Sequence, residues 1–346
     1  MPFTITIKPG NHVCTAREGE SILEAALREG LALPYGCRNG ACGICKGRIL
    51  EGSVDYGVYQ EGALGDAEKR AGLALFCRAT PLSDITIECR EARAARDIQL
   101  RTLPARVHKM EKAAPDVMVL YLKLPPYERL QFLPGQYIDI LLPGGLRRSF
   151  SLANAPHDDE FLQLHIRLVP GGLFSHYVFN VLREKTILRF EGPHGDFFLR
   201  EDSDKPIIFV AGGTGFAPVK SMLEHAFHVG IDRQMVLYWG ARRLRDLYMP
   251  NLPSEWQQRH ENFTFIPVLS EPGPEDAWPG RTGLVPQAIL DDFADLGGYQ
   301  VYASGTPAMV EAAHAAFAAR GLPESEFFSD AFTFSAPQQP SSGLGA

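Results

Sequence analysis

Apolar and polar positions alternate over the first ninety residues as they do in a small domain of strands and one helix. Thr4–Lys8 and His12–Ala16 each show the period of two that is typical of a strand. Ser21-Ile22-Leu23-Glu24 has the spacing of a capping box, and a helical period follows it. A further strand is expected over Ile85–Cys89, so this part of the chain is predicted to be an α+β domain.

The pattern changes beyond residue 102 to short strands that are separated by proline and glycine. Six strands at this spacing predict a small antiparallel β-barrel. The expected strands are Ala105–Lys109, Val117–Lys123, Gln136–Leu142, Arg148–Leu152, Leu162–Leu168 and Ile187–Glu191.

A third pattern begins near Pro206, where a short continuous apolar run, Ile207–Ala211, is typical of a buried parallel strand. A glycine-rich turn and a helical segment to Val229 follow it. Further strand-like runs alternate with helical stretches, which predicts a doubly wound parallel sheet of the α/β class. These runs are Met235–Trp239, Phe263–Leu269 and Gln300–Ala303.

The changes of pattern divide the chain into three domains. We expect a first domain over residues 1–91, a barrel over 102–200 and a parallel-sheet domain over 201–334. Residues 92–101, which are small and charged, are interpreted as a linker. Residues 335–346 have a low-complexity composition and are expected to be disordered.

Composition narrows the classes of function. The net charge is −7, and no segment is basic enough to predict nucleic-acid binding. No apolar run approaches the roughly 20 residues of a membrane span, and the N-terminal residues lack the apolar core of a secretory signal. A cytoplasmic protein that binds neither membrane nor nucleic acid is therefore expected.

The cysteines carry the most specific chemical signal. Three of them have the spacing Cys37-x4-Cys42-x2-Cys45, and 31 residues separate the third from Cys77. Three thiolates from one loop and a fourth from a distant segment are what a plant-type [2Fe–2S] cluster requires. The alternative is a structural zinc site, but four-cysteine zinc sites usually have two short knuckles, and no second knuckle is present here.

A flavin site is indicated in the barrel segment. Arg148-Ser149-Phe150-Ser151 offers a cation for a pyrophosphate, an aromatic face for a flavin ring and a hydroxyl for a ring nitrogen. His165-Ile166-Arg167 ends a predicted strand. Gly171-Gly172-Leu173-Phe174-Ser175 then opens a predicted helix, whose first amides would favour an anion. Together the three segments predict a site for the FAD diphosphate that includes Ser175.

A nicotinamide nucleotide site is predicted in the third domain. Gly213-Thr214-Gly215-Phe216-Ala217-Pro218 connects a strand to a helix, as phosphate-binding turns do. It is not the Rossmann fingerprint, because Pro218 replaces the third glycine and Arg242-Arg243 stands where an acidic residue is expected. Gly305, Thr306 and Pro307 follow another parallel strand at its carboxyl end, where such sheets bind ligands. NADH is preferred over NADPH, although Arg242 could bind a 2′-phosphate.

With these motifs in place, the chain resembles the ferredoxin-reductase superfamily in the order [2Fe–2S] domain, FAD domain, NAD domain. It looks most like the reductases of CDP-6-deoxy-Δ3,4-glucoseen and the reductase components of oxygenases. The likeness is carried by LPYGCRNGACGICKGRI, GQYIDILLPGG, FEGPHGDFFLRED, GGTGFAPVKSM and FFSDAF. The resemblance implies a β-grasp ferredoxin domain, a six-stranded barrel and an NAD(P)-binding domain.

The resemblance also implies roles for single residues. Relatives usually have tyrosine at the position of Phe150 and cysteine at the position of Ser304. Asp330 and Phe332 correspond to the C-terminal group that lies over the flavin in relatives, and hydride is expected to reach the flavin near Ser151. Ser151, Ser304, Asp330 and Phe332 are therefore the expected catalytic group.

The implied reaction takes hydride from NAD(P)H and passes single electrons through the cluster to a partner protein. That partner is expected to be a deoxysugar dehydratase or, alternatively, a terminal mono- or dioxygenase. Arg38 and Asn39, on the cysteine loop, are candidate docking residues for it or simply solvated loop residues. An alternative of another class is a binding module whose iron–sulfur cluster senses redox state.

Overall fold

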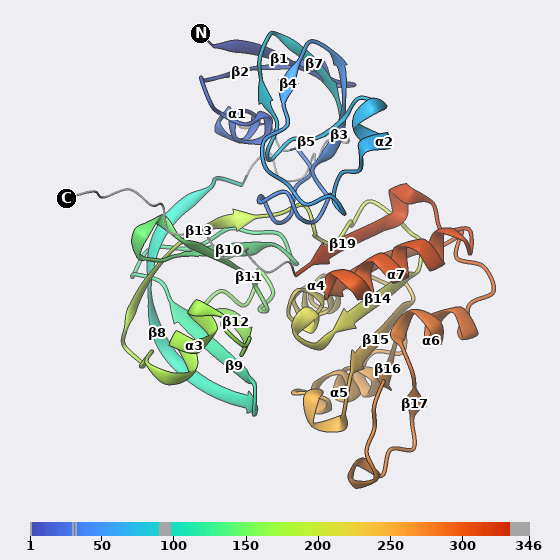
Figure 1. Cartoon of the computed structure of the whole chain (residues 1–346). Coiled ribbons are helices and arrows are strands. Elements are labelled where there is room, and N and C mark those ends of the chain that lie inside the picture. Colours follow the sequence, from blue (N-terminus) through green and yellow to red (C-terminus); the bar gives the residue numbers. More distant parts are fainter. Residues whose placement is uncertain (1, 30, 32, 90–97, 333–346) are drawn as a thin grey trace.

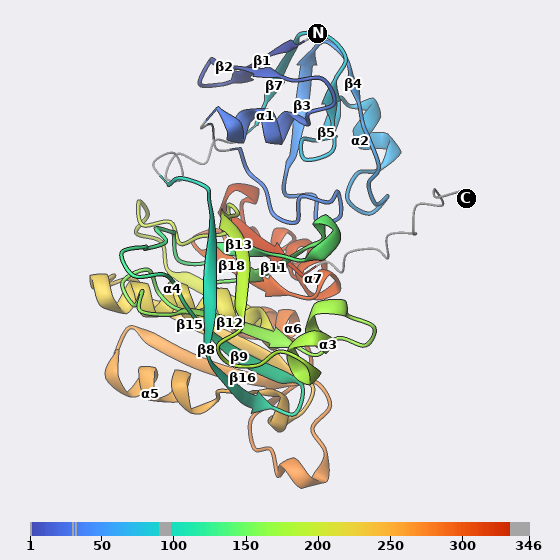
Figure 2. The ribbon, with the colours of Figure 1, turned by 90° about the vertical axis from the view of Figure 1, so that its left-hand side faces the viewer.

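A computed structural model describes residues 2–29, 31, 33–89 and 98–332. Within these ranges each expected domain has one main sheet, and the first domain has a further sheet of two short strands. Figures 1 and 2 show the N-terminal domain, in blue, above the junction between the barrel and the parallel sheet. The expected disordered tail and most of the expected linker lie outside the described residues.

The N-terminal domain is a five-stranded sheet in the order β2-β1-β7-β3-β5, with β1 parallel to β7. The Ser21 hydroxyl accepts the Glu24 amide and the Glu24 carboxylate accepts the Ser21 amide, which confirms the capping box. The elements are β1 (Phe3–Lys8), β2 (His12–Ala16), α1 (Ile22–Arg28), β3 (Lys46–Glu51), β4 (Val54–Asp55), α2 (Asp66–Arg70), β5 (Leu73–Leu75), β6 (Thr80–Pro81) and β7 (Ile85–Glu88).

The second sheet has six antiparallel strands in the order β11-β10-β13-β8-β9-β12. A bridge between Leu152 and Leu164 brings its two outer strands together, so the sheet closes as the predicted barrel. The first strand is longer than expected and begins at Arg101, the last residue assigned to the linker. The elements are β8 (Arg101–Ala114), β9 (Val117–Lys123), β10 (Tyr137–Leu141), η2 (Pro143–Gly145), β11 (Arg147–Ser151), β12 (Leu162–Arg167), α3 (Leu173–Asn180) and β13 (Ile187–His194).

The third sheet is wholly parallel, in the order β17-β16-β15-β14-β18-β19. The order reverses between β14 and β18, which is where doubly wound sheets bind ligands. Helices α4 and α5 cover one face, and α6 and α7 cover the other. The elements are β14 (Ile207–Gly212), η3 (Gly213–Gly215), α4 (Phe216–Val229), β15 (Met235–Ala241), η4 (Leu244–Asp246), α5 (Asn251–Arg259), β16 (Phe263–Leu269), η5 (Pro274–Asp276), β17 (Arg281–Thr282), α6 (Val285–Asp292), β18 (Gln300–Gly305), α7 (Pro307–Ala318), η6 (Glu324–Glu326) and β19 (Phe327–Ala331).

No helix among the described residues has the length and apolar character needed to cross a membrane.

Candidate functional site

The four expected cluster cysteines lie together at the end of the N-terminal domain that faces the barrel. Cys37, Cys42 and Cys45 come from one loop, residues 35–45, which we call the cluster loop. Cys77 approaches it from the segment after β5, and its Sγ lies 3.1 Å from that of Cys45. The loop turns tightly because Gly40 takes a φ of +80°, a conformation that a side chain would strain.

The cluster loop directs amide hydrogens at sulfur. The amides of Ala41 and Cys42 donate to Cys37 Sγ at 3.4 and 3.3 Å, and the amide of Cys37 donates to Cys42 Sγ. The hydrogen bond from Cys42 and the loop amides lower the pKa of Cys37 to about 5. Burial raises the pKa of Cys14, in β2, to about 11. Within the same loop the hydrogen bonds to neighbouring thiols and burial raise the pKa of Cys42 and Cys45, so the loop favours the thiolate at Cys37. Amide donors to sulfur tune the potential of an iron–sulfur cluster.

Strand β11 carries the first predicted flavin segment. The Phe150 ring packs against Phe174 with centroids 5.3 Å apart. The Ser149 hydroxyl donates to Asp139 at 2.7 Å, so it is already engaged within the barrel. Arg148 donates to the carbonyl of Arg147 and retains other guanidinium N–H groups for a phosphate.

The expected catalytic residues meet where the barrel touches the parallel sheet. Ser151, at the end of β11, donates to Asp330 of β19 at 3.3 Å. Asp330 in turn pairs with Ser304 of β18 in the parallel register. Burial raises the pKa of the Asp330 carboxyl to about 7. The amide of Phe332 donates to the carbonyl of Gly305, which ties the end of the described chain to β18.

Two buried polar atoms near this junction have no hydrogen-bond partner among the described residues. One is the hydroxyl of Ser304, which is fully buried, and the other is Nε2 of His165. The other ring nitrogen of His165 lies 2.8 Å from the Tyr248 hydroxyl, so the histidine joins β12 to the third domain. Because an unmade buried hydrogen bond is costly, such atoms are typical of a site completed by a ligand.

The remaining predicted flavin residues have different environments. Ile166 lies in the barrel core, so only its backbone can reach a ligand. Arg167 pairs with Asp116 at 2.8 Å. Gly172 precedes the first residue of α3, Leu173, which is exposed, and Gly171 takes a φ of +72°. The Ser175 hydroxyl accepts the amide of Val169, so it closes the loop before the helix.

The glycine turn of the third domain, residues 212–215, lies against the end of β18. A Cβ on Gly215 would lie 2.0 Å from the carbonyl oxygen of Ser304, so only glycine permits this approach. A Cβ on Gly213 would lie 2.5 Å from a guanidinium nitrogen of Arg167. The turn therefore adjoins both β18 and the predicted flavin strand β12. Thr214 and Pro218 are buried beside it.

The other predicted nucleotide residues lie at the same edge of the sheet. Gly305 ends β18, Thr306 precedes α7 and Pro307 is its first residue. Arg242 follows β15; its side chain is 65% exposed and lies 3.6 Å from Asp246. Arg243 forms an ion pair with Glu275.

The structure corrects the expectation for Arg38. Its guanidinium pairs with Asp139 at 3.1 Å and lies 3.8 Å from Glu191, both in the barrel. Arg38 is thus used inside the molecule instead of facing a partner. No local sequence signal links these residues, because Asp139 stands 101 positions along the chain from Arg38. Asn39 remains exposed.

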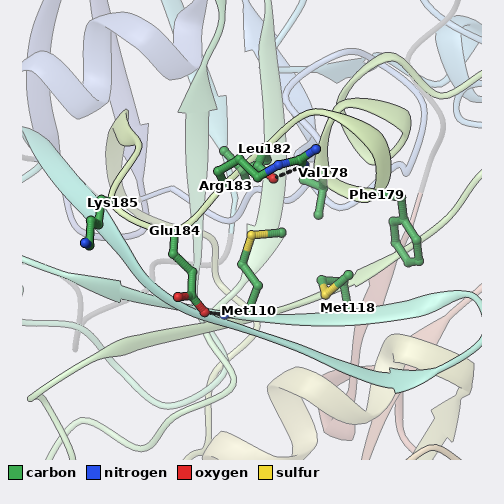
Figure 3. A pocket seen from close by; sticks show the side chains of 8 residues that line it. All are labelled: Met110, Met118, Val178, Phe179, Leu182, Arg183, Glu184 and Lys185. Atoms are coloured by element: carbon green, nitrogen blue, oxygen red, sulfur yellow. Dashed lines mark hydrogen bonds between the residues drawn. The ribbon is translucent and has the colours of Figure 1, made fainter.

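A hollow on the outer side of the barrel contains none of the predicted site residues (Figure 3). Its lining comes from β8, β9 and the region around the end of α3, and includes Met110, Met118 and Phe179. The hollow is thus separate from the residues predicted to bind the cofactors.

Three family models match the chain in the expected order. The 2Fe-2S iron-sulfur cluster binding domain matches residues 5–82, the oxidoreductase FAD-binding domain matches 104–199 and the oxidoreductase NAD-binding domain matches 209–315. These matches assign the cysteine site to a [2Fe–2S] cluster in place of zinc, and they assign FAD and a nicotinamide nucleotide to the other domains.

Similar proteins cover nearly the whole chain. The CDP-6-deoxy-L-threo-D-glycero-4-hexulose-3-dehydrase reductase of Yersinia pseudotuberculosis is 40% identical over 96% of this chain and 99% of its own. Reductase component 1 of the terephthalate 1,2-dioxygenase of Comamonas is 37% identical over 92% of this chain and 93% of its own. The crystal structure of the Amycolatopsis cytochrome P450 reductase GcoB superposes with a TM-score of 0.80, at 35% identity over 95% of this chain and 98% of that one.

Proposed function

Because the chain belongs to the family of NAD(P)H reductases that carry FAD and a [2Fe–2S] cluster, we propose that it supplies electrons to a dehydrase acting on a CDP-linked 6-deoxyhexulose. The observation that carries this choice of partner is the 40% identity, over almost the full length of both chains, to reductases named for such a dehydrase. FAD accepts two electrons together and releases them singly, and the protein supplies position and electrostatics.

The proposed roles of the residues follow the order of the three domains. The glycine turn and the start of α7 hold the nucleotide phosphates, since no side chain caps either helix start. Arg148 and the amides at the start of α3 hold the FAD diphosphate, and Phe150 faces the flavin ring. Four cysteines bind the cluster, namely Cys37, Cys42, Cys45 and Cys77.

Asp330 is proposed to hold a proton at the hydride-transfer site. Its carboxyl is 3.3 Å from the Ser151 hydroxyl, and with a pKa of about 7 it is mostly protonated below pH 7. Ser304, whose buried hydroxyl has no partner among the described residues, is proposed to bond the nicotinamide or the flavin there.

NADH is proposed as the donor. Both arginines that could bind a 2′-phosphate already face carboxylates, Arg242 near Asp246 and Arg243 with Glu275. Steady-state reduction of cytochrome c with each nucleotide tests this proposal. A kcat/KM at least roughly tenfold higher for NADH is expected, which corresponds to about 1.4 kcal/mol of discrimination. A preference for NADPH would contradict it.

A second acceptor has its own support. Oxygenase reductases are 34–37% identical over 91–96% of this chain, and the P450 reductase shares its fold. The two candidates separate in a reconstitution experiment. The reductase is mixed with NADH and either a purified CDP-6-deoxyhexulose dehydrase and its substrate or an oxygenase component, and product formation is measured. Product formation in the oxygenase mixture but not in the dehydrase mixture would contradict the proposed acceptor. Product formation in the dehydrase mixture but not in the oxygenase mixture supports it.

A further inference from the structure

Three side chains of the barrel converge on one point at the border with the N-terminal domain. Asp139 of β10 and Glu191 and His194 of β13 have oxygen and nitrogen atoms that all lie within 4.8 Å of one another. We call these three residues the carboxylate socket. A trio of this kind is suited to a cation, because two acceptor carboxylates and an imidazole face the same space.

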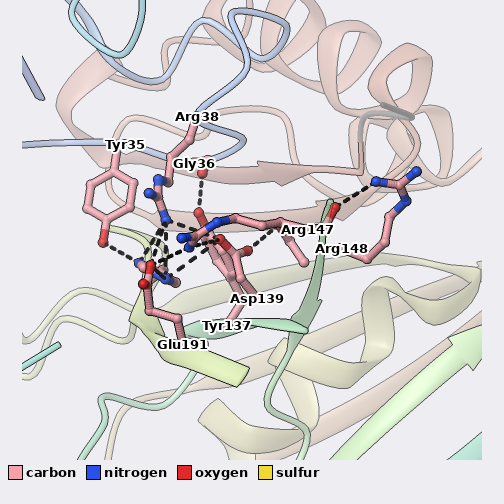
Figure 4. A network of polar contacts seen from close by, with 10 residues as sticks. Tyr35, Gly36, Arg38, Tyr137, Asp139, Arg147, Arg148 and Glu191 are labelled. Carbon is pink, nitrogen blue, oxygen red and sulfur yellow. Dashed lines mark hydrogen bonds and ion pairs between the residues drawn. The ribbon is translucent and has the colours of Figure 1, made fainter. Parts of the chain in front are cut away.

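Arg147 of β11 already pairs with Glu191 at 2.5 Å and lies 3.8 Å from Asp139. The cation that the cluster loop adds to this space is the guanidinium of Arg38. Its Nη1 lies 3.1 Å from Asp139 Oδ2, 3.2 Å from His194 Nε2 and 3.8 Å from Glu191 Oε1 (Figure 4). The Asp139 side chain is 6% exposed and that of His194 is fully buried. Arg38 is nearer to Asp139 than Arg147 is, and a buried carboxylate that loses its nearest charge partner is destabilised.

The residues on both sides of Cys37 are fixed to the barrel in the same way. The Tyr137 hydroxyl donates to the carbonyl of Gly36, and the amide of Asp196 donates to the carbonyl of Tyr35 at 3.0 Å. The Tyr137 ring also belongs to the hydrophobic core of the N-terminal domain. Cys37 is therefore enclosed by contacts to the barrel on both sides along the chain.

The same barrel strand also supports the flavin segment. In β10, Tyr137 pairs with Ser151 and Asp139 pairs with Ser149 of β11. The Asp139 carboxylate accepts a hydrogen bond from Ser149 on one oxygen and the Arg38 ion pair on the other. A single carboxylate thus connects the predicted flavin strand to the residue that follows a cluster ligand.

We propose that Arg38 is a positioning residue, which locks the cluster loop into the carboxylate socket so that one electron passes from reduced FAD to the oxidised cluster across a fixed distance. The electron lost by the flavin is the one that the cluster gains. This inference rests on the proposed electron transfer inside the molecule and does not depend on which protein accepts the electrons. A wrong assignment of the acceptor would leave it intact, and its failure would leave the proposed acceptor intact.

Anaerobic stopped-flow absorption separates the two transfers inside the molecule. In Arg38→Ala, flavin reduction by NADH keeps its rate, whereas cluster reduction slows several-fold, because the rate of electron transfer falls off exponentially with the distance between the two cofactors. Arg38→Lys restores part of the rate, because an ammonium is a point charge without the guanidinium fork. Arg70→Ala, an exposed arginine of the same domain, serves as the matched control.

A variant on the barrel side keeps the test independent of cluster assembly. Asp139→Asn breaks the same contact without changing the cluster loop, and the double variant is expected to be no slower than Arg38→Ala. Iron and flavin contents are measured for each. The proposal would be overturned if the two substitutions slowed cluster reduction additively in the double variant. It would also be overturned if Arg38→Ala protein with full iron and flavin content reduced its cluster at the parental rate.

Two readouts do not need the loaded enzyme. Amide hydrogen exchange of the cofactor-free protein reports the docking directly, and exchange at Asp196 is expected to rise at least roughly tenfold in Arg38→Ala, because its hydrogen bond to Tyr35 crosses the border. Millimolar methylguanidinium is expected to restore protection in Arg38→Ala but not in the double variant. Unchanged exchange in Arg38→Ala would show that the guanidinium does not hold the domains together.

Discussion

At the scale of single residues, close approach decides how the nucleotide edge is built. Gly215 lies against the backbone of Ser304, and Gly305 lies against Gly212, where a Cβ would meet Cα at 3.1 Å. These contacts bring the glycine turn and the end of β18 together at the point where the strand order reverses. The predicted catalytic group is therefore positioned by backbone contacts as much as by side chains.

Gly215→Ala is expected to lower the free energy of unfolding of the third domain by about 1–3 kcal/mol, because the added methyl overpacks a backbone contact. It should also weaken NADH binding in a fluorescence titration. Gly298→Ala is the control, since a Cβ there meets nothing within 4 Å. Equal stability of the two variants would contradict the claim that a side chain at Gly215 clashes with the backbone of Ser304.

Asp330 predicts a pH dependence with a definite sign. Its pKa is raised from 3.8 to about 7, so between these values the unfolded chain loses a proton that the folded chain keeps. The contribution of Asp330 to the free energy of unfolding then falls as the pH rises from about 4 to 7, and it does not change further above pH 7. Asp330→Asn removes the effect, so its gain in melting temperature over the parent, measured on flavin-free protein, should grow across that window. A gain that is largest at pH 4 would contradict the assignment.

At the scale of elements, β19 joins Asp330, the aspartate proposed to act in hydride transfer, to the sheet. Its Phe328 is buried and stacks on Tyr302 of β18, with ring centroids 4.8 Å apart and planes at 18°. The packing of this edge strand fixes the register that places Asp330 beside Ser304.

Phe328→Ala is expected to cost about 3–5 kcal/mol of stability, as loss of a buried aromatic ring usually does. Urea unfolding of the third domain measures the cost. Leu284→Ala, which truncates a side chain 67% exposed in the same domain, should change it little. Similar losses in both variants would mean that the stacking on Tyr302 contributes nothing specific.

The sequence predicted the elements whose signals are local. The capping box at Ser21, the long helix to Val229 and the six barrel strands all depend on spacing within a few residues, and the structure has them. The pairing of Arg38 with Asp139 and Glu191 could not be predicted, because it depends on how two domains pack. The strand β19 was likewise missed, since FFSDA is too short to show a period.

At the scale of the whole molecule, the three cofactor sites follow one another along a single route. The third domain meets the barrel at Ser151 and Asp330, and the barrel meets the N-terminal domain at Asp139 and Arg38. We therefore expect electrons to reach an outside acceptor from the cluster and not from the flavin.

Cys77→Ser tests that serial order. Loss of one of four ligands should abolish the iron–sulfur absorption, while NADH still reduces the flavin and the small oxidant ferricyanide at the parental rate. Reduction of cytochrome c should fall to background. Undiminished cytochrome c reduction in protein without iron would show that electrons leave from the flavin directly.

The carboxylate socket bears on how reductases of this kind can be recombined. A ferredoxin module transplanted from another protein brings its own residue at the position of Arg38, while the recipient barrel keeps Asp139, Glu191 and His194. Without a matching cation Asp139 would lose its nearest charge partner, and Arg147 of the barrel, 3.8 Å away, would be left to offset it. In a chimeric reductase, Arg38 and the carboxylate socket should therefore be exchanged together. The same ion pairs would have limited which ferredoxin and barrel modules could be combined during evolution.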